Sequence, residues 1–140
     1  MKRLLLDTHT FIWALTDDPE LGTFARSLLV DAGNKIYVSA ASVWEAGIKS
    51  ALGKWSVPLD LEEAIDAFGA KPLPISPYHA KMAANLPLHH MDPFDRLIIA
   101  QAQKADGDGH CGRKAVICCW CEVLDAAGKS GHSGVFVALF

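Results

Sequence analysis

The sequence has neither a long hydrophobic run nor an excess of positive charge. Its first apolar run, Leu4–Leu6, is too short for a signal-peptide core, and no later run approaches the length of a membrane span. We therefore expect a soluble, cytoplasmic protein. The 13 Lys and Arg against 16 Asp and Glu give a formal net charge of −3, so the chain lacks the overall basic character of many nucleic-acid binders. The 140 residues, 51% of them hydrophobic, fit one domain with a full core.

The three leucines instead predict a short strand that ends abruptly at Asp7. An apolar run without alternation is typical of a strand covered on both faces, as in the parallel sheet of an α/β protein. Ligands of such sheets gather beyond the carboxyl ends of the strands, where Asp7 falls. Asp7 also suits the N-cap of a helix beginning around His9 and Thr10, and this role is compatible with ligand binding.

A second acid, Glu45, follows the predicted strand Ile36–Val38. Ser39 or Ser42 is expected to cap the next helix, in which large apolar side chains share one face that we expect to lie in the core: Trp44, Ile48 and Leu52. Glu45 lies at the border of this face. A solvated surface glutamate is the alternative interpretation.

Two further acids, Asp92 and Asp95, open an apolar helix at Pro93. Residues three apart share a helix face, and two carboxylates about 4 Å apart repel by roughly 4 kcal/mol at an effective dielectric near 20. A divalent cation would reverse the sign of that interaction. Helix capping is the alternative, because Asp92 suits an N-cap and Asp95 the positive end of the helix dipole.

Other apolar patterns alternate between helix and strand, which favours a parallel sheet. After a turn at Asp17–Glu20, we expect a helix that carries Leu21, Phe24, Ala25, Leu28 and Leu29. A loop bounded by Gly53 and Pro58 precedes an amphipathic helix with Leu61, Ala64, Ile65 and Phe68. A short strand at Leu73–Ile75 and a helix from Pro77 with Ala80, Ala83 and Ala84 follow.

Taken together, these motifs resemble the PIN domain family, and more narrowly the VapC-type toxins of bacterial toxin–antitoxin pairs. The resemblance covers residues 1 to about 107 in order, through the segments Leu4–His9, Ser39–Lys49, Leu86–His90 and Asp92–Ala102. It implies a three-layer α/β/α fold with a central parallel sheet. Residues 1–107 would form the nuclease core, and residues 108–140 would complete or replace the last strands of the same domain.

The resemblance also implies a magnesium- or manganese-dependent endoribonuclease whose distant acids converge on the metal. The residues carried across by motif are Asp7, Glu45, Asp92 and Asp95, of which Asp92 has capping as an alternative. Oxygen ligands of this kind suit Mg²⁺, which activates water and stabilises charge on a leaving oxygen. The implied partners are an RNA substrate, a VapB-like antitoxin and a second copy of the chain, with no membrane.

Cationic side chains near these acids are candidates for contact with RNA phosphates. They are Lys49, His90 and Arg96, together with Lys54 and His89. The alternative is that the Lys and Arg side chains are merely solvated and that the histidines serve as caps.

The segment after Gly107 departs from the family, which leads one to expect a strand and a further acid there. All four cysteines lie in this tail, which suggests a shifted reading frame or an unrelated replacement. Disulfides are not expected in the cytoplasm, and zinc binding lacks the usual paired C-x-x-C spacing. We expect Val116–Cys119 to form a buried strand, with Glu122 or Asp125 as substitutes for the missing acid. The apolar segment Val135–Phe140 is expected to form an edge strand, and the alternative is that it stays loose and promotes association.

Two other functions remain open at this point. The altered tail would leave a catalytically impaired domain that mainly binds an antitoxin or another partner, or the scaffold would serve a metal phosphatase acting on small esters. Cleavage of RNA with Mn²⁺, abolished by Asp95→Asn, distinguishes the nuclease from both.

Overall fold

The computed structural model describes residues 3–57, 60–87, 92–104, 114–118 and 136–139. Its centre is a five-stranded sheet with the strand order β3-β2-β1-β4-β5. Neighbouring strands run parallel except for β5, which is antiparallel to β4. The strands are β1 Arg3–Leu6, β2 Lys35–Ser39, β3 Lys71–Leu73, β4 Lys114–Cys118 and β5 Phe136–Leu139.

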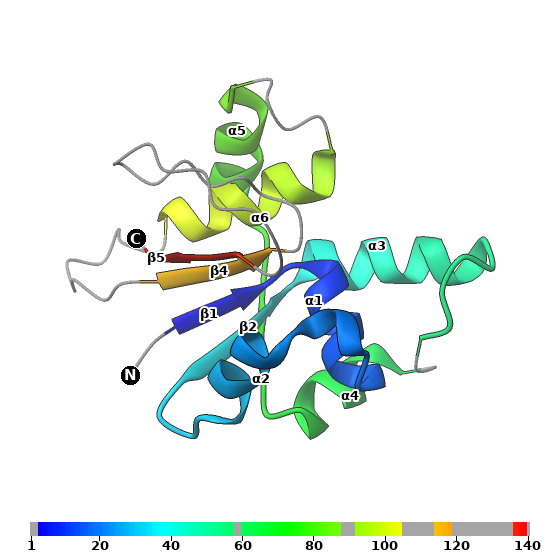
Figure 1. Ribbon diagram of the computed structural model, residues 1–140. Helices are drawn as coiled ribbons and strands as arrows, with labels where there is room; N and C mark the ends of the chain where they lie inside the picture. Colours follow the sequence, from blue (N-terminus) through cyan, green and yellow to red (C-terminus); the bar gives the residue numbers. More distant parts are fainter. Residues whose placement is uncertain (1–2, 58–59, 88–91, 105–113, 119–135, 140) are drawn as a thin grey trace.

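Helices cover both faces of this sheet. Figure 1 shows α5 and α6 on one side and α1, α2 and α4 on the other, while α3 extends from the end of β2. The helices are α1 Thr8–Thr16, α2 Thr23–Val30, α3 Ala40–Ala51, α4 Leu61–Ala67, α5 Pro77–Asn85 and α6 Pro93–Lys104, with a 3-10 turn η1 at Pro19–Leu21. The predicted three-layer α/β/α fold with a central parallel sheet is confirmed.

The apolar run of β1 packs on both faces of the sheet, as its lack of alternation predicts. Successive side chains of a strand point to opposite faces. Leu4 and Leu6 belong to the larger core cluster, while Leu5 packs with Ile98 and Ala102 of α6. This arrangement fixes β1 as the central layer, with its last residue directly before Asp7.

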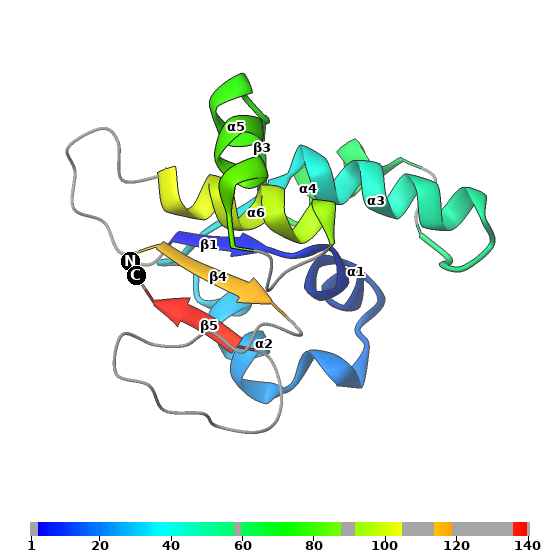
Figure 2. The ribbon, with the colours of Figure 1, turned by 90° about the horizontal axis from the view of Figure 1, so that it is seen from above.

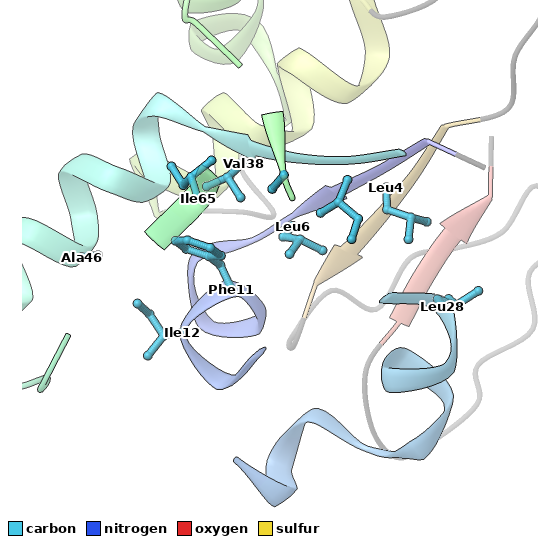
Figure 3. Packing of buried hydrophobic residues seen from close by; sticks show 10 residues of the cluster. Leu4, Leu6, Phe11, Ile12, Leu28, Val38, Ala46 and Ile65 are labelled. Carbon is cyan, nitrogen blue, oxygen red and sulfur yellow. The ribbon is translucent and has the colours of Figure 1, made fainter. Parts of the chain in front are cut away.

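The larger core cluster joins β1 and β2 to the helices below them. Figure 3 shows Phe11 of α1 among side chains from the sheet and from Ile65 of α4. Phe11 is completely buried, and its ring meets the edge of Phe68 at a centroid distance of 6.4 Å. Burying such a side chain contributes roughly 1.5–3 kcal/mol, so this cluster is a main source of the stability of the fold.

The expectation that Trp44, Ile48 and Leu52 face the core is wrong. Trp44 is 61% and Leu52 64% exposed, whereas Glu45 is only 3% exposed. The side of α3 that packs inward carries small residues, Ala41 and Ala46, which let the helix approach closely. Trp44 instead meets the ring of Phe94, at 5.1 Å between centroids. Because both sides of α3 are apolar, hydrophobic spacing pointed to the wrong one.

The strand predicted at Leu73–Ile75 begins and ends two residues earlier. At the end of β3, the carbonyl groups of Leu73 and Pro74 accept hydrogen bonds from the Gln101 side chain. Pro72 is tolerated because β3 is an edge strand.

Strands occur at both predicted places in the tail, with different bounds: β4 begins two residues before Val116 and ends one residue before Cys119, and the edge strand β5 lies within Val135–Phe140. The burial predicted for the first of these strands stays a prediction. The side chains of the tail cysteines, and Glu122 and Asp125, lie outside the described residues. No helix in the described part of the chain combines the length and the apolar character needed to cross a bilayer.

Candidate functional site

Asp7 stands where β1 passes into α1 and is 3% exposed. Its carboxylate accepts a hydrogen bond from the Thr10 backbone N–H at 3.0 Å, so Asp7 is the N-cap of α1. The predicted capping role is therefore present. It fixes this carboxylate at the carboxyl end of the central strand, where ligands of parallel sheets bind.

Glu45 comes to the same region from α3. Ser39 caps this helix by accepting from the Ala41 N–H, at the end of the neighbouring strand β2. One carboxylate oxygen of Glu45 accepts from the Thr8 hydroxyl, and the other lies 2.5 Å from the Lys49 ammonium. Glu45 is therefore a buried, paired carboxylate and not a solvated surface residue.

Asp92 and Asp95 lie at the first turn of α6. Asp92 is exposed, and its carboxylate accepts from the Phe94 N–H at 2.8 Å and the Asp95 N–H at 3.3 Å. Asp92 thus caps α6, as the local sequence allowed. Asp95 is half-buried, and it takes part in this cap through its backbone N–H and not through its carboxylate.

The electrostatics of Asp95 shows that these acids converge. The pKa of Asp95 is raised to about 6, mainly because burial disfavours the charged carboxylate and also because Asp92, Asp7 and Glu45 repel it. The charge of Lys49 acts in the opposite direction. Figure 2 shows why: the first turn of α6 lies beside the ends of β1 and the start of α3. Three acids, from β1–α1, from α3 and from the start of α6, therefore act on the carboxyl group of Asp95.

The donor set is chemically suited to a hard divalent cation. Mg²⁺ binds oxygen ligands, usually one or two carboxylates together with waters and substrate phosphates. Among the described residues, no group of three His, Cys, Asp or Glu side chains is already arranged to hold a metal ion. Each carboxylate oxygen of Glu45 already has one protein partner, and the Lys49 ammonium lies where a cation would approach this carboxylate.

The guanidinium of Arg96 binds the end of α5. Its nitrogens donate to the carbonyl groups of Ala83 and Pro87 at 3.0 Å and of Leu86 at 2.6 Å, with a longer bond to Ala84. The carbonyls at the end of a helix lack partners within the helix, so a cation there is favourable. Arg96 thereby ties α5 to the turn of α6 that carries Asp95.

A buried hydrogen bond between polar side chains links the start of α3 to α6. The Ser39 hydroxyl lies 2.5 Å from the Gln101 amide oxygen, and the Gln101 amide nitrogen donates to the carbonyls that follow β3. Gln101 is 1% exposed. Because Ser39 also caps α3, this bridge fixes the helix of Glu45 relative to the helix of Asp95.

Sequence reasoning did not single out Thr8, Ser39 as a bridge, or Gln101. Thr8 follows Asp7 directly, so its place just after the predicted strand could have marked it as a residue of the site. Gln101 gave none, because its partner lies 62 residues away in the chain. Of the candidate RNA contacts, Lys54 is exposed, and His89 and His90 lie outside the described residues.

The comparisons agree with this architecture. The family model of the PIN domain matches residues 4–108, which is most of the chain. No curated protein matches the sequence. The fold and the converging acids define a nuclease-like α/β domain. The chain belongs to the PIN domain family, whose members are generally nucleases.

Proposed function

We propose that this protein is a metal-dependent endoribonuclease, the toxin of a VapBC-like pair, that hydrolyses RNA phosphodiester bonds in the cytoplasm. The observation that carries the proposal is the gathering of buried Asp7 and Glu45 around half-buried Asp95, whose pKa is raised by its burial and by the charges of Asp92, Asp7 and Glu45. A half-buried carboxylate surrounded by other acids destabilises the fold when it is ionised, so its presence favours a catalytic or metal-binding use.

In this proposal Asp7, Glu45 and Asp95 hold Mg²⁺ or Mn²⁺, and Asp92 adds a ligand or only caps α6. What the metal supplies when bound is activation of a water and neutralisation of charge on the phosphate. The chain supplies the positions. The Thr10 N–H orients Asp7, the Thr8 hydroxyl orients Glu45, and the capped first turn of α6 places Asp95.

Substrate contacts are proposed at Lys49, His90 and Arg96. Lys49 lies beside Glu45, within reach of a phosphate bound at the acids. Arg96 directs its guanidinium to the end of α5, so its contribution to RNA binding would come chiefly through the position of α6. His90 is proposed from its place before Asp92 in the sequence alone.

The partners proposed are a VapB-like antitoxin and a second copy of the chain. The support is the ordered set of motifs from residue 4 to residue 102, not a contact in the structure.

We also infer that residues 1–107 form the nuclease core and that residues 108–140 belong to the same domain. The pairing of β4 with β1 in one sheet supports the inference that the tail belongs to the same domain. Translation of the neighbouring frames of the coding DNA tests whether the tail is a frameshift: a VapC-like ending in another frame would show that it is.

The direct test is cleavage of a mixed RNA substrate by the purified protein with Mn²⁺. We expect cleavage by the parent protein and a loss of at least about a hundredfold in Asp95→Asn, because ligand removal acts on the transition state. The matched control is Asp66→Asn, which removes an exposed carboxylate of α4 and should cleave like the parent.

The same assay separates the two rival functions. A parent protein no more active than Asp95→Asn would favour a catalytically impaired module that binds an antitoxin. Turnover of small phosphate esters with RNA left intact would favour a phosphatase. Either result would overturn the ribonuclease proposal.

A further inference from the structure

The ion pair of Lys49 with Glu45 is not explained by the contact with RNA proposed for Lys49 above. Its ammonium lies 2.5 Å from one carboxylate oxygen of Glu45, four residues earlier on α3. The other oxygen accepts the Thr8 hydroxyl. The Glu45 side chain is 5% exposed and that of Lys49 27%. Both oxygens of this inward-facing carboxylate therefore have a partner within the protein.

The Lys49 ammonium also contacts an aromatic ring, that of Trp55. The chain reverses after α3 at Gly53, whose φ of +68° is favoured by glycine, and the N–H groups of Lys54 and Trp55 then donate to the Lys49 carbonyl. This reversal brings the Trp55 ring to 4.2 Å from the Lys49 ammonium, measured to the ring centroid. His9 packs edge-on against Trp55 at 4.9 Å and supports the ring. Lys49 therefore has a cation–π partner that does not depend on Glu45.

We propose that Lys49 is an internal counterion, which neutralises Glu45 while the acidic site is empty of metal and gives up this carboxylate when a divalent cation binds. The proposal rests on the metal-binding function proposed above. In the exchange the Lys49–Glu45 ion pair breaks, and Lys49 keeps its contact with Trp55. No covalent bond changes and no proton needs to move.

The physical reason is the cost of leaving a charge buried without a partner. Removing one partner of a buried ion pair strongly destabilises a protein, so Glu45 needs a cation in every state. Two cations at one carboxylate repel each other, which makes Lys49 and the metal ion competitors. Because such coupling is reciprocal, loss of Lys49 must strengthen metal binding by the same factor by which metal binding weakens the Lys49–Glu45 pair.

The test is a calorimetric titration with Mn²⁺ of the parent protein, Lys49→Gln and Lys54→Gln. Lys54 is exposed and five residues further along, so its variant removes the same charge without touching Glu45. We expect Lys49→Gln to bind Mn²⁺ about tenfold more tightly than the parent, within the usual range for coupled sites. Lys54→Gln should stay within about twofold, because exposed charges are screened.

Thermal unfolding gives a second readout, which depends neither on RNA cleavage nor on calorimetry. In EDTA, Lys49→Gln should unfold at a lower temperature than the parent. At saturating Mn²⁺ this deficit should disappear, since the metal ion then replaces the lost counterion. Lys49→Arg keeps the charge and should keep affinity for Mn²⁺ close to that of the parent.

Each other outcome contradicts the inference in a recognisable way. Equal or weaker Mn²⁺ binding by Lys49→Gln would mean that Lys49 does not compete, and an equal gain in Lys54→Gln would mean a general charge effect. Absence of Mn²⁺ binding in all three proteins would overturn both this inference and the metal dependence proposed above. Tight binding without RNA cleavage would remove the ribonuclease proposal alone.

Discussion

Burial has opposite effects on stability in strand β1 and at Asp7, the residue that follows it. Leu4 and Leu6 lie in an apolar cluster in which every buried group gains by leaving water. One residue further along, Asp7 is also buried, but its charge repels that of Asp95, as does the charge of Glu45. The first region stabilises the fold, and the second reduces its stability. Their direct connection means that the apolar cluster holds the repelling acids in place.

The apolar region should show the largest effect of any single substitution. Phe11→Ala removes a fully buried ring and is expected to lower the free energy of unfolding by about 3–5 kcal/mol. Urea unfolding followed by circular dichroism measures this loss. Phe24→Ala on α2, where the ring is 59% exposed, is the matched control and should cost less than about 1 kcal/mol. Equal losses in the two variants would contradict the assignment of the core.

The contact of Arg96 that joins the end of α5 to the first turn of α6, which carries Asp95, should show an intermediate effect. Arg96→Met removes four hydrogen bonds to carbonyls at the end of α5 and is expected to lower the free energy of unfolding by about 2 kcal/mol. Arg26→Met breaks a more exposed pair with Asp17 and serves as the control, with an expected loss below about 1 kcal/mol. If Arg96→Met costs no more than Arg26→Met, Arg96 does not hold α5 against α6.

The acidic region should show the smallest effect, with the opposite sign. In EDTA at pH 7.5, Asp95→Asn is expected to raise the free energy of unfolding by about 1 kcal/mol, after allowance for solvent screening of a half-buried group. Burial and neighbouring acids raise the folded-state pKa of Asp95 from 3.8 to about 6, so the folded protein binds this proton more tightly than the unfolded chain. Its destabilising effect is therefore complete above about pH 6 and is lost as the pH falls towards 3.8.

Denaturant unfolding at several pH values checks this prediction. The difference between the parent and Asp95→Asn should shrink between about pH 6 and pH 4, while Asp66→Asn should show no such trend. With saturating Mn²⁺ at pH 7.5 the order should invert, because the parent then gains metal binding that the variant lacks. A destabilising Asp95→Asn in EDTA would show that the acids do not repel one another.

The same comparison explains what the sequence could and could not predict. Asp7 and the start of α6 were predictable because local rules position them: a strand that ends on an acid, and Asp-Pro at a helix start. The orientation of Glu45 was not, because the small residues beside it on α3 are as apolar in pattern as Trp44 and Leu52. Only packing against the sheet selects the inward side.

Contacts between distant residues account for the rest. The i, i+4 spacing of Glu45 and Lys49 is visible in the sequence, but burial of the pair and the bond from Thr8 depend on the position of β1. The bridge from Ser39 to Gln101 joins segments that local propensity treats separately. Sequence patterns thus indicated which acids to consider, and the fold determined their surroundings.

The most direct measurement is anomalous diffraction from crystals of the parent protein soaked in Mn²⁺. We expect one anomalous peak, or two neighbouring peaks, bonded to carboxylate oxygens of Asp7 and Asp95, with the Lys49 ammonium withdrawn from Glu45. Crystals of Asp95→Asn should lose the peak. Manganese bound elsewhere, or none at all beside intact carboxylates, would contradict the claim that these acids share one metal site.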